Sequence, residues 1–242
     1  NLNTQVVPEV AANPLEPVFD EYRNFYFGAA TPLRNAVVAM MDLANKLKEN
    51  AELSSDEEWK KAYSDNFSIL RTQSDNILSY DDSNIDSRLV KAHTSLKEGA
   101  NNFSLAATEY EKFNTDNDAT HHETAIEYIV TGVNSIQTAE NYLALAIAGI
   151  DLDNVSLYDG FEIPDFGDIV QVEGEMTTED NKQVFSYNLS DFSFGQDGSQ
   201  AYGILLGTLG FRVVSDQEGT LTLSNGTETL EMKADESKVY II

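Results

Sequence analysis

The sequence predicts an α+β protein of two domains: an antiparallel four-helix bundle, then a small β-rich domain with one short helix. Two observations support this prediction. Apolar residues recur every three or four positions between residues 19 and 150, and alternating apolar and polar residues replace that pattern afterwards. The length of 242 residues allows two domains, and 41% hydrophobic residues can form a core despite a net charge of −26.

The expected boundaries follow these changes of pattern. They are a flexible N-terminal lead-in at 1–15, the bundle at 16–150, an acidic linker at 151–160 and the β-rich domain at 161–242.

The first helix is expected to carry one apolar seam, because its apolar residues are three and four positions apart. The seam is Phe19, Tyr22, Tyr26, Ala29, Leu33, Ala36, Met40, Leu43 and Leu47. Pro32 lies inside it. A proline removes a backbone hydrogen bond and clashes with the preceding turn, so a kink or a break is expected near Ala30.

Three further helices follow. Ser54 and Ser55 precede two glutamates and form overlapping capping boxes, which predict the start of the second helix, with a stripe over 59–77. The third stripe covers 85–110 and the fourth covers 126–150. Short polar turns join the helices, and the simplest way to bury four stripes is an up-down-up-down antiparallel bundle.

The remaining residues predict strands and one short helix. Residues 169–174 and 183–189 alternate in part, and the runs 220–223 and 227–232 flank Asn225-Gly226. An Asn-Gly pair between two alternating runs predicts a β-hairpin. A helix is expected at about 199–209, where Gly210 is placed to end it.

The composition excludes several classes of protein. With 41 acidic and 15 basic residues the chain lacks the clustered Lys and Arg that nucleic acid or an anionic membrane surface requires. It has no Cys, so disulfides and thiolate chemistry are excluded, and no apolar run reaches the length of a transmembrane helix. The acids concentrate in residues 151–200, which hold 12 acids and one Lys.

The start of the chain suggests an exported protein. The sequence begins at Asn1 rather than Met, and residues 1–15 contain Pro8, Pro14 and a single charged residue, Glu9. We expect an extracellular or cell-surface location, with a signal peptide or lipid anchor upstream of Asn1. The alternative is a chain trimmed at an arbitrary point.

Two resemblances agree with that location. Residues 202–240 resemble the end of the copper amine oxidase N-terminal-like (stalk) module of exported bacterial proteins. The matching residues are Leu209-Gly210, Val213-Val214-Ser215-Asp216, Thr220 to Leu223, Thr229 to Met232 and Ser237-Lys238-Val239-Tyr240. The resemblance implies a short helix, a strand, a Thr-rich hairpin and a last strand, and it implies no copper chemistry.

The helical part resembles domains of unknown function on Gram-positive lipoproteins and secreted proteins. The features that carry this resemblance are the Asp-Glu-Glu-Trp-Lys-Lys start at 56–61 and a single His93 in the third helix. A proline that often precedes the third helix in those domains is missing. The resemblance implies a place outside the cell and supplies no activity.

One segment has the spacing of a calcium loop. The acids at positions 1, 3, 9 and 12 of such a loop are Asp151, Asp153, Asp159 and Glu162. Position 5 is Val155 and position 6 is Ser156, where calcium loops carry an oxygen ligand and a glycine. We therefore expect a solvated acidic linker, with a weak cation site as the alternative, and we assign no metal or cofactor.

The three histidines and one glutamate are the other titratable candidates. His121 and His122 are expected at the surface and at the edge of the seam, and His93 is expected as a hydrogen-bonded seam residue. Helical steps place Glu140 in the fourth stripe, where burial would raise its pKa. The favoured alternative is that Ala139 fills that layer and Glu140 leans to solvent.

No catalytic motif is present, so we predict a protein that is not an enzyme. The leading hypothesis is a structural spacer or protein-interaction module with a protein or cell-envelope partner. The alternative is a ligand- or cation-binding module that uses the segment 151–168. Aromatic and acidic residues interleave at 158–162, 165–166 and 191–194, and they predict either a binding surface or the core of the β-rich domain. The oligomeric state is left open.

Overall fold

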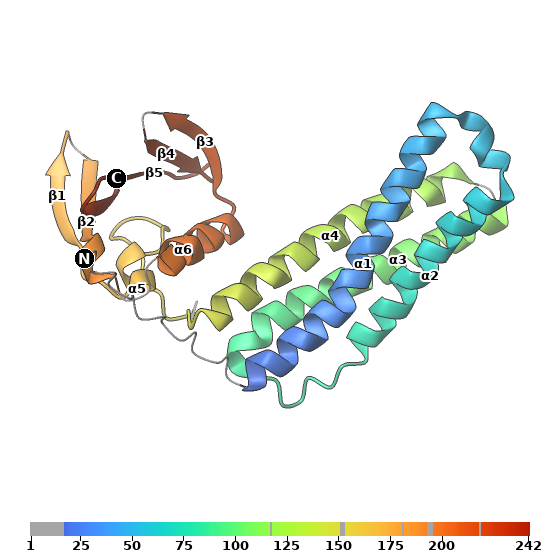
Figure 1. The fold of residues 1–242 in the computed structure, drawn as a ribbon, viewed down its shortest axis with the longest axis horizontal. Helices are drawn as coiled ribbons and strands as arrows, with labels where there is room; N and C mark the ends of the chain where they lie inside the picture. Colours follow the sequence, from blue (N-terminus) through green and yellow to red (C-terminus); the bar gives the residue numbers. More distant parts are fainter. Residues whose placement is uncertain (1–16, 117, 151–152, 181, 193–195, 218) are drawn as a thin grey trace, which may run out of the picture.

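The computed structural model describes residues 17–116, 118–150, 153–180, 182–192, 196–217 and 219–242. Within these residues the chain is α+β, with six α-helices and a six-stranded antiparallel sheet, so the expected class is confirmed. Figure 1 shows the long helices at one end of the molecule and the sheet at the other. The predicted lead-in, residues 1–15, lies outside the described residues.

Four long helices form most of the chain up to residue 150. They are α1 (Pro17–Glu49), α2 (Glu57–Leu78), α3 (Val90–Asp116) and α4 (Ala119–Ile147). Short 3-10 turns at Ala51–Ser55 and Ser87–Leu89 precede α2 and α3. Each helix contacts the next one along the chain, and α1 also contacts α4.

The start of α2 is set by an aspartate rather than by the predicted serines. Asp56 is the N-cap, and its Oδ1 accepts a hydrogen bond of 2.8 Å from the backbone N–H of Trp59. Asn50 caps the preceding 3-10 turn, which includes Ser54 and Ser55. Ser54 and Ser55 therefore lie two residues and one residue before the position that caps the helix.

α1 continues through Pro32 without the predicted break. Ala29, Ala30 and Leu33 on either side are almost completely buried. Burial of this seam against the other helices offsets the hydrogen bond that a proline inside a helix removes.

Close approach of α3 and α4 depends on two glycines. A Cβ on Gly99 would lie 2.9 Å from Cδ1 of Ile136 and 3.1 Å from the backbone oxygen of Gly132. A Cβ on Gly132 would lie 3.0 Å from the ring of Phe103. A larger residue at either position would have to displace the side chain of Ile136 or Phe103, or the neighbouring backbone.

Aromatic contacts join α2 to α3, and a hydrogen bond between residues far apart in the chain joins α1 to α4. Phe67 of α2 stacks on Tyr110 of α3, with 4.0 Å between ring centroids. The hydroxyl of Tyr26 on α1 donates to the backbone oxygen of Ile136 on α4 at 2.9 Å. The core of the helices is therefore continuous from α1 to α4.

The sheet has the strand order β1-β2-β6-β5-β4-β3. The strands are β1 (Glu175–Glu179), β2 (Lys182–Asn188), β3 (Arg212–Gln217), β4 (Thr220–Ser224), β5 (Thr229–Ala234) and β6 (Lys238–Ile241). The pairing of β2 with β6 joins segments far apart in the chain, with Phe185 opposite Ile241. β1 and β3 are the edge strands, and β3 has a bulge between Val213 and Ser215.

The hairpin predicted at Asn225-Gly226 is confirmed, with a longer loop than a two-residue turn. β4 and β5 pair as far as Ser224 and Thr229. Gly226 has a φ of +90°, and Oδ1 of Asn225 accepts from the backbone N–H groups of Thr227 and Glu228. The asparagine therefore acts through its side chain.

Two further helices lie with the sheet. α6 (Gln196–Thr208) confirms the helix predicted at about 199–209, and Gly210 follows it with a φ of +88°. The strand predicted at 169–174 is wrong, because residues Phe166–Val170 form the short helix α5. Ile169 and Val170 are both buried. A short apolar run is compatible with either element, and tertiary packing decides between them.

A second apolar cluster lies between α5, α6 and the sheet. Leu145, near the end of α4, belongs to this cluster, and α6 contacts α4. Tyr158 also belongs to it and is 4% exposed, so the predicted linker 151–160 contributes to the core of the sheet region.

We expect glycine-to-alanine substitutions to separate close packing from helix propensity. Gly99→Ala and Gly132→Ala should each lower the free energy of unfolding by about 1–2 kcal/mol, because the added methyl group meets Ile136 or Phe103. Gly28→Ala is the matched control, since a Cβ there meets nothing within 4 Å. It should raise stability by about 0.5–1 kcal/mol. Urea denaturation measures all three, and equal effects would contradict the close packing.

Candidate functional site

The segment after α4 folds back on itself around Tyr158. The backbone N–H of Tyr158 donates to the oxygen of Ile163 at 2.9 Å, and that of Asp165 donates to Ser156 at 2.8 Å. Leu157 forms an isolated bridge with Pro164. These bonds close a loop, residues 157–164, which we call the Tyr158 loop.

A chain of hydrogen bonds fixes this loop on the sheet. The Tyr158 hydroxyl accepts from the backbone N–H of Phe166 at 3.0 Å and lies 2.8 Å from the hydroxyl of Tyr187. Tyr187 donates to Oδ1 of Asp165 at 2.9 Å. Because Tyr187 has a single proton, Tyr158 is the donor between the two phenols. Burial raises the pKa of both phenols, so they stay protonated at physiological pH.

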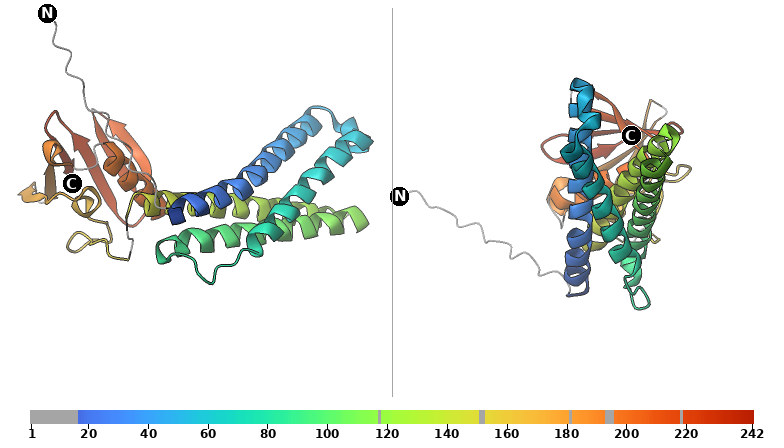
Figure 2. Two further views of the ribbon diagram at one scale, coloured as in Figure 1. Left: turned by 60° about the horizontal axis from the view of Figure 1, so that its bottom comes forward. Right: turned by 90° about the vertical axis from the view of Figure 1, so that its right-hand side faces the viewer.

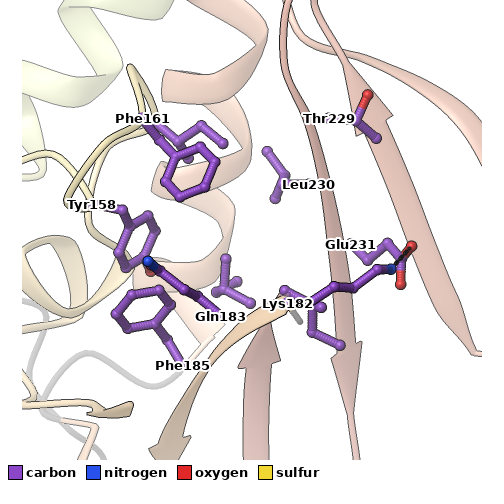
Figure 3. A pocket seen from close by; sticks show the side chains of 11 residues that line it. Tyr158, Phe161, Lys182, Gln183, Phe185, Thr229, Leu230 and Glu231 are labelled. Atoms are coloured by element: carbon purple, nitrogen blue, oxygen red, sulfur yellow. Dashed lines mark hydrogen bonds and ion pairs between the residues drawn. The ribbon is translucent and has the colours of Figure 1, made fainter. Parts of the chain in front are cut away.

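The Tyr158 loop and the sheet enclose a cavity of about 470 Å³, which we call the sheet pocket. Its lining residues are Tyr158, Phe161, Ile163, Lys182, Gln183, Phe185, Thr229, Leu230, Glu231, Ile241 and Ile242. Figure 3 shows side chains from the loop opposite those from β2 and β5. The walls are mostly apolar, and the volume lies within the range of small-molecule sites.

Lys182, Gln183 and Glu231 are among the polar side chains that border this apolar space. Nζ of Lys182 pairs with Oε1 of Glu231 at 2.8 Å, so these two charges neutralise each other. Oε1 of Gln183 is buried and has no hydrogen-bond partner. In Figure 3 the Gln183 amide lies beside the rings of Tyr158 and Phe185. A buried acceptor without a partner costs free energy, and a ligand that drew the Gln183 amide toward the pocket and donated to its oxygen would remove that cost.

A larger cavity, of about 730 Å³, lies at the far end of the helices beside Trp59 and His122. Two ring nitrogens beside this cavity are engaged within the fold: Nε1 of Trp59 donates to the backbone oxygen of Leu43, and Nε2 of His122 is 3.1 Å from the hydroxyl of Tyr63. The sheet pocket is the stronger candidate site because one of its lining residues, Gln183, carries a polar atom without a hydrogen-bond partner.

The predicted cation ligands do not converge in the part of the chain that the structure describes. Asp151 lies outside the described residues. Asp153 pairs with Nζ of Lys91 on α3 at 2.6 Å, and the side chains of Asp159 and Glu162 belong to exposed residues. Among the described residues no group of three or more His, Asp or Glu could hold a metal ion.

The histidines lie where the sequence placed them. His93 is 4% exposed, and its Nδ1 is 3.1 Å from the hydroxyl of Tyr22. His121 pairs with Glu109 at 2.6 Å near the surface. Burial lowers the pKa of His93 and of His122, so both favour the neutral form.

Glu140 leans out of the core, and this confirms the prediction that Ala139 fills that layer instead. Its side chain is 32% exposed and pairs with Arg34 of α1, while Ala139 is completely buried. The ion pair joins α1 to α4 at the same level as the link from Tyr26, because Nη2 of Arg34 also lies 3.4 Å from the Tyr26 hydroxyl.

Only part of the lining of the sheet pocket could be predicted from the sequence. The aromatic and acidic stretch 158–162 includes Tyr158 and Phe161, and these do line the pocket. Gln183, Leu230 and Ile241 come from three strands whose pairing depends on long-range register. The sequence of β2 contains one sign of the pocket: Gln183 occupies a position on the strand face that otherwise carries Phe185 and Tyr187.

Comparison of the chain with protein-family models, curated proteins and solved structures gives no match. Within the described residues, no helix combines the length and apolarity needed to cross a membrane. The two family resemblances therefore stay predictions.

We expect stability to fall in mild acid because of His93, which is buried, and His122, which is half-buried. Their folded-state pKa values lie below the ordinary value of 6.5, so the unfolded chain binds more protons as the pH falls below that value. Each histidine can remove at most about 1.4 kcal/mol per pH unit. The free energy of unfolding, measured by urea denaturation, should therefore be lower at pH 5.5 than at pH 7.5.

The double variant His93→Gln/His122→Gln should show a smaller drop between these two pH values than the unaltered chain. His121→Gln is the matched control, because the His121 side chain is 29% exposed and pairs with two acids, Glu109 and Asp116. An unchanged drop in the double variant would show that other groups cause it.

Proposed function

We propose that the chain is a non-enzymatic binding protein and that the sheet pocket is its ligand site. One observation carries this proposal: a mostly apolar cavity of about 470 Å³ is lined in part by Gln183, whose buried Oε1 has no partner. Ligand sites combine apolar walls with a few convergent polar groups, and the pocket has both. This proposal develops the ligand-binding alternative for the segment 151–168.

The walls define the chemistry of the ligand. The rings of Tyr158 and Phe185 pack with centroids 4.3 Å apart, and Phe161 stands beside the same space (Figure 3). Flat apolar groups pack well against such rings. Since Lys182 and Glu231 already neutralise each other, a ligand without net charge fits best. We therefore propose a neutral, flat, apolar group that carries one hydrogen-bond donor.

Indole is a suitable probe, because it is flat and apolar and has one N–H donor. We expect it to bind with a dissociation constant of about 0.1–1 mM, in keeping with its few heavy atoms. Amide chemical-shift changes should be confined to the Tyr158 loop and strands β2, β5 and β6. Gln183→Leu should weaken indole several-fold and leave naphthalene, which has no donor, unchanged or stronger.

Matched controls test the site itself. Phe161→Ala should weaken indole several-fold, because it removes one wall of the pocket. Phe27→Ala on α1 removes a side chain of similar exposure, 41% against 44%, and should change nothing. Shift changes spread outside the pocket, or equal effects of the two substitutions, would contradict the proposed function.

The cation-binding alternative has less support. Lys91 pairs with Asp153, one of the four acids of that loop, and no cluster of ligands forms among the described residues.

We further infer that α1 to α4 are an antiparallel four-helix bundle and that the sheet region is a second domain. Contacts from α1 to α2, α2 to α3, α3 to α4 and α1 to α4 support the bundle. Two separate apolar clusters, one among the helices and one under the sheet, support two domains. Leu145 supports a fixed junction, since it lies on α4 and packs in the second cluster.

A second proposal is that the helices act as a spacer on an exported cell-surface protein. The length of α1 favours it: 33 residues of α-helix extend about 50 Å. In an antiparallel bundle α1 begins at the end of the helices where α4 leads into the sheet region (Figure 1), so an attachment upstream of Asn1 would leave the opposite tip of the helices pointing away from the surface. The placement outside the cell is a prediction from the sequence.

A further inference from the structure

The tip of the helical region contains an exposed apolar groove between α1 and α4. The groove has a volume of about 400 Å³, and we call it the α1–α4 groove. Its apolar walls are formed chiefly by Met40, Met41 and Ala44 on α1 and by Ile126, Val130 and Val133 on α4. Met41 is 62% exposed and Val130 is 56% exposed. Large apolar side chains gathered in one exposed place indicate a contact surface.

The groove exists because the helices separate toward this end. The left view of Figure 2 shows α1 and α2 rising away from α3 and α4. Gly99 and Gly132 hold α3 against α4, and the links from Tyr26 and Arg34 hold α1 to α4 below the groove. The sequence pattern places Ile126 and Val133 in the core stripe, yet both are about two-fifths exposed. The apolar stripe of α4 therefore extends beyond the part of α4 that α1 covers.

The shape of the groove fits a helix. Its α1 wall runs from Val37 to Lys48, about three turns or 16 Å, and its α4 wall runs antiparallel to it. Two helices with facing apolar stripes accept a third helix that places residues i, i+3, i+4 and i+7 between them. Methionines at Met40 and Met41 can adapt to different apolar side chains.

Charge identifies the chemistry of that helix. Glu123 and Glu127 are exposed residues one turn apart on α4, three positions before Ile126 and Val130, and they border the groove rather than line it. Lys48, at the end of the α1 wall, is the one charged residue among the described residues that line it. Asp42 on the α1 side pairs with Lys46 at 2.8 Å. The chain carries a net charge of −26, so two copies repel each other and a basic partner is attracted over a longer range. A second copy of this chain is therefore the weaker fit.

We propose that the α1–α4 groove binds an amphipathic helix of a partner protein, with an apolar stripe in the groove and Lys or Arg beside Glu123 and Glu127. The site is independent of the sheet pocket, because the two share no lining residue. The proposal gives the protein an interaction surface for a basic helical segment.

A synthetic helical peptide tests the groove in the full chain. The peptide has leucine on one face and lysine on the other, and its comparison peptides have glutamate in place of lysine or a scrambled order. At physiological salt the basic amphipathic peptide should bind with a micromolar dissociation constant, by calorimetry, and the comparison peptides at least tenfold more weakly. No binding of the basic peptide, or equal binding of the scrambled one, would overturn the proposal.

Variants locate the binding. Met41→Gln/Val130→Gln should weaken the basic peptide at least tenfold, and both positions are exposed enough to leave the fold unchanged. Leu105→Gln on α3, 45% exposed, is the matched control and should change affinity less than twofold. Glu123→Gln/Glu127→Gln should weaken binding several-fold and reduce its dependence on salt.

Sedimentation equilibrium tests separately whether a partner helix or a second copy of this chain occupies the α1–α4 groove. The chain without peptide should be a monomer. A dimer that disappears in Met41→Gln/Val130→Gln would overturn the proposed partner, because a second copy would then cover the groove. Equal loss of peptide binding in Leu105→Gln would overturn the location.

Discussion

The close packing of α3 on α4 is the constraint on which the rest of the helical region depends. Gly99 and Gly132 let these two helices approach until the side chain of one meets the backbone of the other. α2 reaches this pair through aromatic rings, which need more space, and α1 reaches it through Tyr26 and Arg34. The tight pair and the looser pair therefore diverge, and their divergence exposes apolar side chains on α1 and α4.

A comparable constraint governs the sheet region. The phenols of Tyr158 and Tyr187 form one hydrogen-bond chain that ends on Asp165, and this chain fixes the Tyr158 loop above the sheet. The sheet pocket lies between the Tyr158 loop on one side and the ends of strands β2, β5 and β6 on the other. The helical and sheet regions thus each contain a tightly fixed part beside an open apolar space. Leu145 of α4 joins the two regions.

The sequence predicted features that depend on neighbours in the chain. Helical periodicity located α1 to α4, Asn225-Gly226 located the β4–β5 hairpin, and Gly210 located the end of α6. The strand at 169–174 was wrong because a short apolar run does not choose between a strand and a buried helix. The sheet pocket needs the register of β2 with β6, and the groove needs the angle between helices. Neither is encoded in local periodicity.

The two edges of the sheet have a consequence for how the protein behaves in acid. β1 and β3 present unpaired backbone groups, and Val213 and Val214 on β3 are more than half exposed. Such edges pair with other chains unless something keeps copies apart. Here the acidic surface does so, and that repulsion vanishes near the isoelectric point of about 4.1. Colloidal stability at neutral pH therefore depends on charge, and acidification exposes the sheet to edge-to-edge association.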